Sequence, residues 1–366
     1  MFVYFLILLW VFICAILSLD LRISKLQQKR IILLLISIPL ILLAGIRDGI
    51  GVDFDTYLQH YEEVTNLFSF ERTFQSMEVG YEYLVSVFKT FHLPFFFVTL
   101  FIALITFELF NHLSLRYSTF PSLSLLMFFS LTFWGQVMGQ MRQPLAILSL
   151  YFFLFLLKKG KNCILLLFLI TILVGLLFHK SVIFFLLPLL FLTRQLKVHQ
   201  YGVILVLSII VGHRLVSLMP LIINYIPDFF TFKDAAIAYL TYKSEGVTFT
   251  LGMIERITMF LIVTYYCAKY QILEKDKLML IFYNMYFYGI CLYFLLIPFS
   301  DVLASRGTFV LTWSLFFLFP NTLKYISKKQ DFIIVFIVII LWSLYLSTKV
   351  FFRDDNIYIP YKSIFS

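Results

Sequence analysis

Residues 31–57 read IILLLISIPLILLAGIRDGIGVDFDTY. The uncharged apolar run at its start ends just before Arg47, and Asp48, Asp53 and Asp55 follow closely. Charge is scarce in this chain, because only 13% of its residues are Asp, Glu, Lys or Arg. Ionisable groups held at a membrane boundary are costly, and they are usually kept because they bind or react. The stretch therefore predicts a membrane-spanning helix followed by a functional segment.

The composition of the whole chain indicates a membrane protein. Its mean hydropathy is +0.95, 61% of its residues are hydrophobic and 45 are Phe, which exceeds what a soluble chain of 366 residues tolerates. Apolar stretches of about 16 to 20 residues recur along the chain, as helices that cross a core of about 30 Å require. The alternating segments of about 10 residues that build membrane barrels do not occur. We therefore predict an all-α polytopic integral membrane protein.

About twelve transmembrane helices are expected. They are predicted over residues 2–19, 31–46, 93–110, 120–138, 143–157, 163–178, 182–193, 201–212, 251–268, 278–298, 307–320 and 332–348. The segments 182–193 and 201–212 are short for a full crossing. The first span lacks a basic leader and an Ala-x-Ala cleavage site, so we interpret it as retained. Because no long soluble segment or internal repeat interrupts the series, we predict a single transmembrane domain over residues 1–366.

The loops between the predicted spans alternate in charge. One set holds 16 of the 29 basic residues but five of the 20 acidic ones. Its basic members are Arg22, Lys25, Lys29, Arg30, Arg116, Lys158, Lys159, Lys161, Arg194, Lys197, Lys269, Lys275, Lys277, Lys324, Lys328 and Lys329. The positive-inside rule predicts that these loops are cytoplasmic, which places both termini outside. The formal net charge of +9 is thus mostly a topology signal and does not point to a nucleic-acid partner.

Two long loops, residues 47–92 and 213–250, fall on the outer side. Loops of this length in a compact membrane protein are usually functional or disordered. Their Tyr, Phe and Pro residues and their amphipathic runs favour ordered interfacial helices. The working surface is therefore expected to face outward.

The four Cys residues lie inside predicted spans and suggest neither a disulfide nor a zinc site. We also expect no cofactor.

The basic residues on the outer side differ in kind from those on the cytoplasmic side. Seven Arg and six Lys fall there, and five of these arginines lie at span ends: Arg47, Arg142, Arg214, Arg256 and Arg306. A guanidinium fork matches phosphate oxygens bidentately, whereas Lys acts as a point charge. Any single Arg could equally well extend to lipid headgroups. For five arginines on one membrane face, a shared anionic ligand is the better explanation.

Two outer turns carry further candidate residues. Arg142 and Gln143 precede Pro144 at a predicted helix start, where backbone N–H groups also favour anions. The alternative, an ordinary polar hairpin between the fourth and fifth spans, is less favoured. His179 lies in the next outer turn. It is either a general base, a hydrogen-bonding partner of a sugar hydroxyl, or an interfacial histidine without chemistry.

Two pairs of charged residues have alternative interpretations. Glu78 and Glu82 would share one face of a helix, where they could orient sugar hydroxyls, although a water-exposed face is favoured. Glu255 and Arg256 lie one turn inside a predicted span and fit a structural ion pair as well as a ligand site.

The Asp53-Phe-Asp55 segment resembles the Asp-x-Asp motif that holds a divalent metal in nucleotide-sugar transferases. The pattern is short, and nucleotide sugars are cytoplasmic whereas this segment is predicted to lie outside, so we expect no metal there. The chain also lacks a Walker A motif, a Gly-x-Gly-x-x-Gly fingerprint, a His-Glu-x-x-His motif and a Gly-x-Ser-x-Gly motif.

Four short motifs, in this order, resemble the EpsG-type branch of the O-antigen polymerases, the Wzy proteins. They are Arg47 with Gly51-x-Asp53-x-x-x-Tyr57, then Glu78-x-Gly80-Tyr81, Arg142-Gln143-x-x-Ala146 and Phe178-His179-x-Ser181. The layout is similar over nearly the whole chain. After residue 182 the resemblance rests on hydropathy and on Arg256 and Arg306.

The resemblance implies a GT-C-like glycosyltransferase in the bacterial inner membrane. Such an enzyme would transfer a growing glycan from undecaprenyl pyrophosphate to the non-reducing end of the next lipid-linked repeat unit, on the periplasmic face. Loops 47–92 and 213–250 would form the substrate vestibule, and Phe-rich spans would line grooves for the polyprenyl chains. A chain-length regulator of the polysaccharide co-polymerase type is the implied partner.

The resemblance and the charge pattern together assign roles to residues. Arg47, Arg142, Arg256 and Arg306 are expected to hold pyrophosphate, because preorganised cations stabilise a leaving group on which charge develops. Asp53, Asp55 and His179 are the candidates for activating the acceptor hydroxyl. The other predicted substrate-binding residues are Tyr57, Glu78, Tyr81, Gln143, Arg214 and Glu255.

Two other functions were weighed. An O-antigen ligase uses the same donor and has a similar hydropathy, so phenotype rather than sequence separates it from a polymerase. A flippase or other transporter would place ionisable residues and broken helices in the middle of its spans. This chain keeps nearly all its charges at span ends, which disfavours transport.

Overall fold

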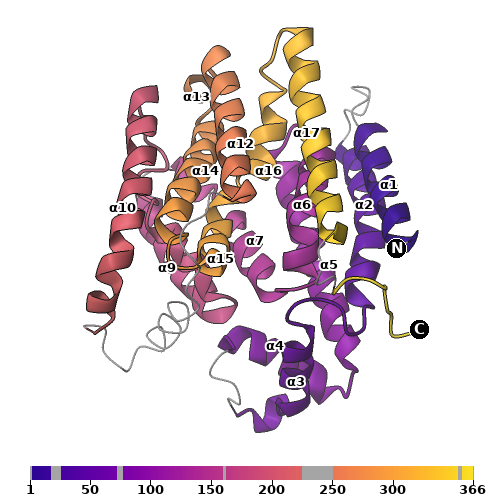
Figure 1. The fold of residues 1–366 in the computed structure, drawn as a ribbon. Coiled ribbons are helices and arrows are strands. Elements are labelled where there is room, and N and C mark those ends of the chain that lie inside the picture. The colour runs from indigo at the N-terminus through magenta and orange to yellow at the C-terminus, as the bar shows by residue number, and fades with distance from the viewer. Residues whose placement is uncertain are drawn as a thin grey trace. The chain divides into compact units, whose positions relative to one another are not determined.

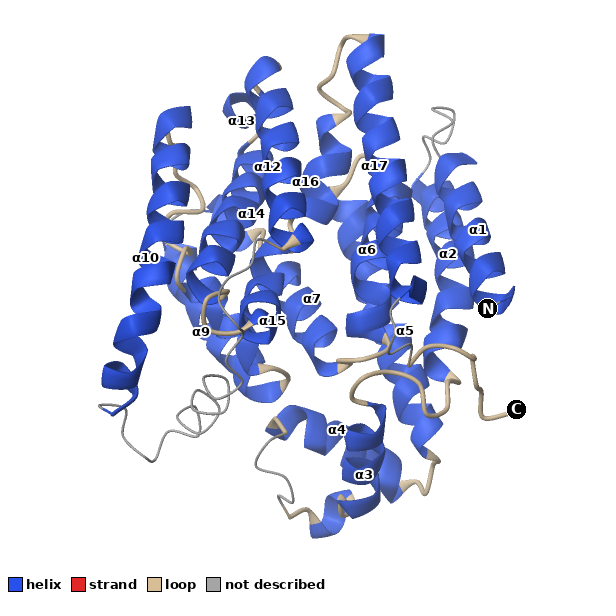
Figure 2. Cartoon of the chain, viewed as in Figure 1, coloured by secondary structure: helices blue, strands red, loops and turns tan. Residues whose placement is uncertain are grey.

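A computed structural model describes residues 2–17, 26–71, 77–159, 162–224, 250–352 and 357–365, and every regular element in these ranges is a helix (Figures 1 and 2). The long helices are α1 (Phe2–Leu17), α2 (Leu26–Gly45), α5 (Phe95–Tyr117), α9 (Asn162–Leu177), α10 (Val198–Asn224), α12 (Leu251–Lys269), α14 (Lys277–Leu296) and α17 (Lys329–Lys349). The shorter α-helices are α3 (Phe54–Glu63), α4 (Val79–Thr90), α6 (Pro121–Thr132), α7 (Arg142–Phe152), α8 (Leu156–Lys159), α13 (Ile272–Lys275), α15 (Asp301–Thr312) and α16 (Leu315–Thr322). The 3-10 helices are η1 (Leu67–Ser69), η3 (Lys180–Leu186) and η4 (Val350–Phe352), and η2 (Phe133–Val137) is a π-helix.

The chain divides into two compact units. The first comprises Met1–Val182 and Phe319–Ser366, and the second comprises Ile183–Leu318. The predicted single domain over residues 1–366 stays a prediction.

Several helices have the length and composition of membrane spans. Six described helices qualify, and a seventh is reached if α15 and α16, which are bent by 51° at their junction, count as one span. The six are Leu26–Gly45, Phe95–Tyr117, Val198–Leu215, Leu251–Lys269, Lys277–Leu296 and Lys329–Phe352. Phe2–Leu17 and Cys163–Leu177 are apolar but shorter. The protein is thus a multi-pass helical membrane protein, and the count of about twelve crossings stays a prediction.

Residues 182–193 differ from the predicted α-helical span. They continue the 3-10 helix η3 and then form turns around Pro188. Backbone outside an α-helix leaves carbonyl groups unpaired, and a membrane protein tolerates such groups only where other parts of the protein bind them. The buried side chain of Asn284, on α14, binds them here: its amide donates to the carbonyls of Leu192 at 2.8 Å and Arg194 at 2.9 Å.

The neighbouring short segment, residues 201–212, lies inside the longer helix α10. Tyr201 at its start donates a hydrogen bond of 2.7 Å to the side-chain oxygen of Asn284. The backbone of Gly212 lies so close to Leu295 on α14 that a Cβ atom would not fit there. Asn284 and Gly212 therefore fix α10 against α14 within the second unit.

In the first unit, α2 and α5 run antiparallel. The hydroxyl of Thr99 near the start of α5 donates to the carbonyl of Gly45 at the end of α2. Farther along, Asn111 of α5 donates to the hydroxyl of Ser37 on α2 at 3.0 Å. The predicted outer loop 47–92 contains α3, η1 and α4, and α3 and α4 lie next to each other in Figure 1. Residues 225–249 of the other predicted outer loop, 213–250, lie outside the described residues.

Replacing Asn284 should destabilise the fold. Asn284→Leu leaves buried backbone carbonyls without donors, and each such loss costs about 1–3 kcal/mol. We expect a clearly lower apparent melting temperature in detergent, whereas Gln27→Ala, at an exposed amide on α2, should melt like the wild type. Equal melting temperatures for both variants would show that Asn284 does not hold this non-helical segment.

Candidate active site on the outer loop

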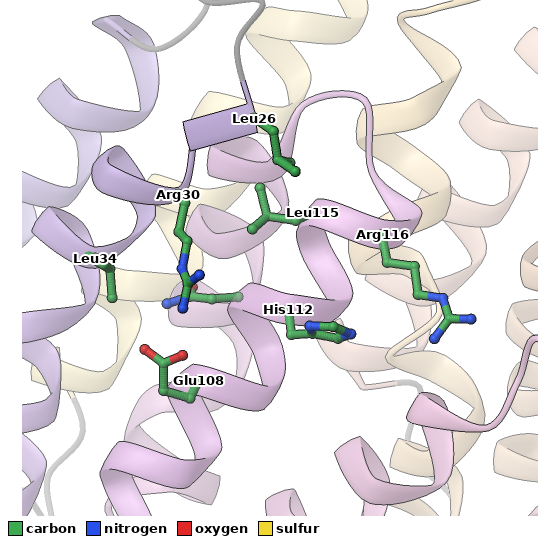
Figure 3. Close-up of a pocket in the computed structure, with 8 residues that line it drawn as sticks. Leu26, Arg30, Leu34, Glu108, His112, Leu115 and Arg116 are labelled. Carbon is green, nitrogen blue, oxygen red and sulfur yellow. The ribbon is translucent and has the colours of Figure 1, made fainter. Parts of the chain in front are cut away.

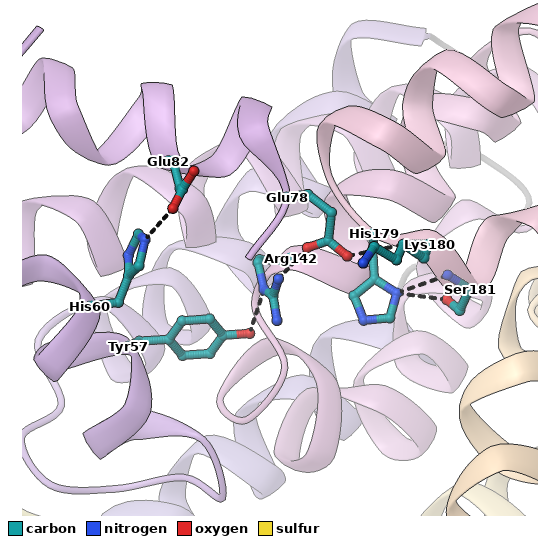
Figure 4. Close-up of polar contacts among 8 residues, drawn as sticks. All are labelled: Tyr57, His60, Glu78, Glu82, Arg142, His179, Lys180 and Ser181. Carbon is teal, nitrogen blue, oxygen red and sulfur yellow. Dashed lines mark hydrogen bonds and ion pairs between the residues drawn. The ribbon is translucent and has the colours of Figure 1, made fainter. Parts of the chain in front are cut away.

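Arg142 is the centre of a polar cluster formed by segments far apart in the sequence (Figure 4). It is the first residue of α7. One guanidinium nitrogen, Nη1, donates to Oε2 of Glu78 in an ion pair, and Nε donates to the hydroxyl of Tyr57 at 3.4 Å. The guanidinium carbon lies 5.6 Å from the ring centre of Tyr57 and 5.7 Å from that of Tyr81. The first three motifs found in the sequence thus meet at one guanidinium.

Glu78 joins the fourth motif to this cluster. It is the N-cap residue of α4, and its second carboxylate oxygen accepts a hydrogen bond of 3.2 Å from the backbone N–H of Lys180. The side chain is only 5% exposed, and Glu82 is fully buried. The favoured interpretation of these two carboxylates as a water-exposed face was therefore wrong, because α4 turns that face toward α3 and α7.

His179, Ser181 and Gln143 form a hydrogen-bonded chain. The amide of Gln143 donates to the hydroxyl of Ser181 at 2.7 Å, and this hydroxyl lies 2.8 Å from Nδ1 of His179. The backbone N–H of Ser181 also donates to Nδ1, at 3.2 Å. Because Nδ1 is an acceptor, a neutral His179 carries its proton on Nε2. The basic nitrogen of the ring is thus already engaged by Ser181.

Two glycines allow the segments of the cluster to approach each other. Gly51 has φ of +117°, and a Cβ atom there would collide with the carbonyl oxygen of Met138. A Cβ atom on Gly80 would collide with the carbonyl oxygen of Leu177. The first contact brings the loop before α3 to the turn before α7, and the second brings α4 to the end of α9.

Arg47 is the second cation of the site, and it is only 1% exposed. Its Nε donates to the carbonyl of Ile50 at 3.0 Å, and its Nη1 donates to the carbonyl of Ala44. Among the described residues, Nη2 has no hydrogen-bond partner, and no carboxylate lies within ion-pair distance of this guanidinium. Burial lowers the pKa of Arg47 to about 10, which still leaves it charged at neutral pH.

Tyrosines take the place of an acidic partner around Arg47. Four of them interact electrostatically with its guanidinium: Tyr57, Tyr81, Tyr358 and Tyr361. Tyr57 and Tyr81 interact in the same way with Arg142, so these two phenols are coupled electrostatically to both cations. Burial raises the pKa of both phenols, which therefore stay protonated. Within the described part of the chain, the buried hydroxyl of Tyr81 has no hydrogen-bond partner.

The two candidate aspartates lie in different surroundings. Asp53 is the N-cap residue of α3, is half-buried and interacts electrostatically with Tyr57. Asp55 lies in the first turn of the same helix and is exposed.

The remaining predicted substrate-binding residues belong to the second unit. Arg256, on α12, donates to the carbonyl of Gly252 at 3.0 Å and lies 4.0 Å above the ring of Tyr293. Glu255 is half-buried beside it and interacts electrostatically with Tyr286. Arg306 is half-buried on α15, and Arg214 is exposed on α10. Convergence of these arginines with Arg47 and Arg142 stays a prediction.

The sequence model of the EpsG family matches residues 30–363. The chain belongs to the EpsG family. This membership indicates a polysaccharide polymerase-type function, of the kind that a glycosyltransferase performs in a membrane. No curated protein and no solved structure is significantly similar to the chain.

The C-terminal segment, residues 357–365, contacts this candidate site, and the sequence did not predict that contact. Its Ser363 pairs with Arg47 in an antiparallel β-bridge, in which Ile364 N–H donates to the carbonyl of Ile46 at 3.0 Å. The hydroxyl of Tyr361 donates to the carbonyl of Leu43 at 3.0 Å, and the hydroxyl of Tyr358 donates to the carbonyl of Trp134 at 2.9 Å. The two tyrosines in a short polar tail were the only sequence signal for this contact.

His60 and Glu82 form a second buried pair that was not predicted. His60 Nε2 lies 3.6 Å from Glu82 Oε1, and both side chains are fully buried (Figure 4). The His60 ring centre lies 5.5 Å from that of Tyr81. Burial, with a smaller contribution from Arg142, lowers the pKa of His60 to about 4. His60 is therefore neutral at physiological pH and supports Tyr81 from the side of α3.

Loss of the hydrogen bond from Ile364 N–H to the Ile46 carbonyl should loosen the C-terminal segment that pairs with Arg47. Ile364→Pro removes the N–H that donates to Ile46, which should cost about 1 kcal/mol of stability and shorten the polysaccharide product. Ile364→Ala shortens the side chain but keeps this N–H, so it serves as the matched control. Melting temperature and product length on gels measure both effects, and equal behaviour of Pro and Ala would refute the role of the bridge.

His60 predicts a pH dependence of stability. The unfolded chain protonates His near its ordinary pKa of about 6.5, whereas the folded chain does so only near pH 4. The stabilisation is thus fully present above about pH 6.5 and is lost as the pH falls toward 4. His60→Gln should make the melting temperature depend less on pH between 4 and 7, and an unchanged slope would contradict this.

Proposed function

We propose that the protein polymerises glycans carried on undecaprenyl pyrophosphate, at the periplasmic face of a bacterial inner membrane. It transfers the growing chain from its lipid pyrophosphate to the non-reducing end of the next lipid-linked repeat unit. The observation that carries this proposal is a buried Arg47 with no carboxylate in ion-pair distance among the described residues, together with two tyrosines that interact electrostatically with both Arg47 and Arg142.

A buried cation without an acidic partner is costly, so such an arginine is best explained by an anion that binds there. Pyrophosphate is such an anion, and the guanidinium forks of Arg47 and Arg142 match its oxygens. The protonated phenols of Tyr57 and Tyr81 add uncharged donors that do not compete for the cations. Glu78 fixes the direction of the Arg142 guanidinium through its ion pair.

In the proposed reaction, the acceptor hydroxyl attacks the anomeric carbon of the growing chain. The bond between that carbon and the pyrophosphate oxygen breaks, and the leaving pyrophosphate takes up the electron pair. Arg47 and Arg142 stabilise the charge that develops on it. Asp53 accepts the proton of the acceptor hydroxyl, because it is half-buried next to Tyr57 whereas Asp55 is exposed.

We assign His179 a positioning role. Its Nδ1 is engaged by the hydroxyl and the backbone N–H of Ser181, so it is a poorer base than Asp53. Its Nε2–H suits a hydrogen bond to a sugar hydroxyl or a phosphate oxygen. Arg256 and Arg306 complete the pyrophosphate site in this proposal, and Arg214 and Glu255 contact the glycan. A chain-length regulator of the polysaccharide co-polymerase type is the proposed partner.

Substitution of either central arginine tests the proposal. Arg47→Ala or Arg142→Ala should lower polymer formation by about 100-fold or more, and Lys at either position should restore little, because it lacks the fork. The rate of polymer formation is measured with purified protein and its lipid-linked repeat unit. The cellular phenotype is the chain-length ladder of the glycan on gels. Arg194→Ala, at an exposed arginine of the predicted cytoplasmic side, is the control.

The phenotype also separates the polymerase from its alternative. Loss of a polymerase leaves single repeat units on the capped lipid, whereas loss of a ligase removes all surface glycan.

In the assay with purified protein, Asp53→Asn should abolish polymer formation, whereas Asp55→Asn should retain most of it. Normal chain-length ladders in both arginine variants, at wild-type membrane levels, would refute the proposed function.

A further inference from the structure

A cavity with charged residues in a largely apolar lining lies at the other end of α5 from the candidate active site (Figure 3). Its volume is about 460 Å³, and it lies between α2 and α5. Thr99 of α5 contacts the end of α2 that leads to Arg47. His112, which lines the cavity, lies thirteen residues farther along α5. At 1.5 Å per residue, about 20 Å of helix separates the two places.

One face of each helix lines the cavity. Leu26, Arg30 and Leu34 are spaced by four residues on α2, and Glu108, His112 and Arg116 have the same spacing on α5. Residues at this spacing point to the same side of a helix. The buried pair of Asn111 and Ser37 joins the two helices beside it, so its walls are fixed.

The charged groups of this cavity have few partners in the protein. Among the described residues, no hydrogen bond or ion pair involves the side chains of Arg30, His112 or Arg116. The guanidinium carbon of Arg116 lies 4.6 Å from the ring centre of Phe155. Stacking of this kind holds a guanidinium in place while its N–H groups stay available at the edge.

The balance of charge in the cavity favours an anion. Two arginines lie against one carboxylate, Glu108, so the lining carries one net positive charge when His112 is neutral. Both arginines belong to the Lys-rich side that the positive-inside rule places in the cytoplasm. Basic pockets between membrane helices on that side bind lipid headgroups, and anionic lipids give this leaflet a negative surface potential.

We propose that the cavity binds one anionic phospholipid, phosphatidylglycerol. Its phosphodiester carries one negative charge, which matches the net charge of the lining, and it accepts hydrogen bonds from Arg30 and Arg116. Its glycerol hydroxyls donate to the carboxylate of Glu108. Leu26, Leu34 and Leu115 supply apolar surface for the start of the acyl chains. This site is independent of the proposed polymerase chemistry, since none of these residues belongs to the cluster around Arg142.

Native mass spectrometry of the full-length protein tests the proposal. The protein is incubated in mild detergent with equal amounts of phosphatidylglycerol, phosphatidylethanolamine and phosphatidylcholine. We expect phosphatidylglycerol adducts to dominate on the wild type. The double variant Arg30→Gln/Arg116→Gln should lower their occupancy about tenfold, because each arginine contributes to anionic-lipid binding.

Controls separate this site from general attraction to anionic lipid. Arg194→Gln/Lys197→Gln removes the same number of charges from the predicted cytoplasmic side outside the cavity, and it should leave the occupancy unchanged. Leu115→Phe narrows the cavity while keeping every charge, so it should also displace the lipid. An excess of glycerol 3-phosphate should not compete, because the apolar wall contributes to binding.

Three outcomes would overturn the proposal. Equal binding of the three lipids would remove the preference for an anion. Equal loss in the two double variants would reduce the effect to surface charge. Competition by glycerol 3-phosphate would make this a site for a soluble phosphate. A melting temperature equal to that of the wild type confirms that a variant is folded. The test does not depend on polymer formation.

Discussion

The ion pair between Arg142 and Glu78 is the constraint on which the arrangement of the candidate active site depends. A pair that is nearly removed from water is stable only when its remaining donors and acceptors are also bound. Tyr57 binds the arginine, and the backbone of Lys180 binds the carboxylate. The start of α7, the start of α4, helix α3 and the turn after α9 are therefore held by one set of contacts. Removal of either charge would leave the other buried without its partner, so the four segments depend on one another.

Arg47 imposes a second and different constraint. Its guanidinium is buried among tyrosines, and the C-terminal segment covers it through the bridge to Ser363. The phenols of Tyr57 and Tyr81 remain protonated, so they do not neutralise this cation. The site thus keeps a positive charge that the described residues do not neutralise, which suits an enzyme whose proposed leaving group is pyrophosphate. The neutral imidazole of His60, beside the buried Glu82, packs against the ring of Tyr81.

Helix α5 connects two places with different chemistry. Near its start it packs beside the outer site, where Phe95 lies against Phe54 of α3 with ring centres 5.5 Å apart. Near its end it lines the cavity that we assign to an anionic lipid. Both places offer guanidinium groups to phosphate oxygens, and both contain a carboxylate, but the protonated phenols of Tyr57 and Tyr81 belong to the candidate active site. This difference is why we assign group transfer to the candidate active site and lipid binding to the cavity.

The sequence by itself determined the class of the protein and predicted residues for its site. Hydropathy and the spacing of charges are local properties, so they indicated a multi-pass helical membrane protein and selected Arg47, Arg142 and His179 as candidates, whereas Glu78 was selected through the family resemblance. The sequence could not determine which of these side chains contact each other. Those contacts depend on close approaches of distant backbone segments, such as Gly51 to Met138 and Gly80 to Leu177. Only the tertiary structure decided the burial of Glu78 and Glu82, the non-helical path of residues 182–193 and the cover that the C-terminal segment places over Arg47. Each of these depends on partners far away in the chain, such as Asn284 for the carbonyls of Leu192 and Arg194, and local pattern contains no information about such partners.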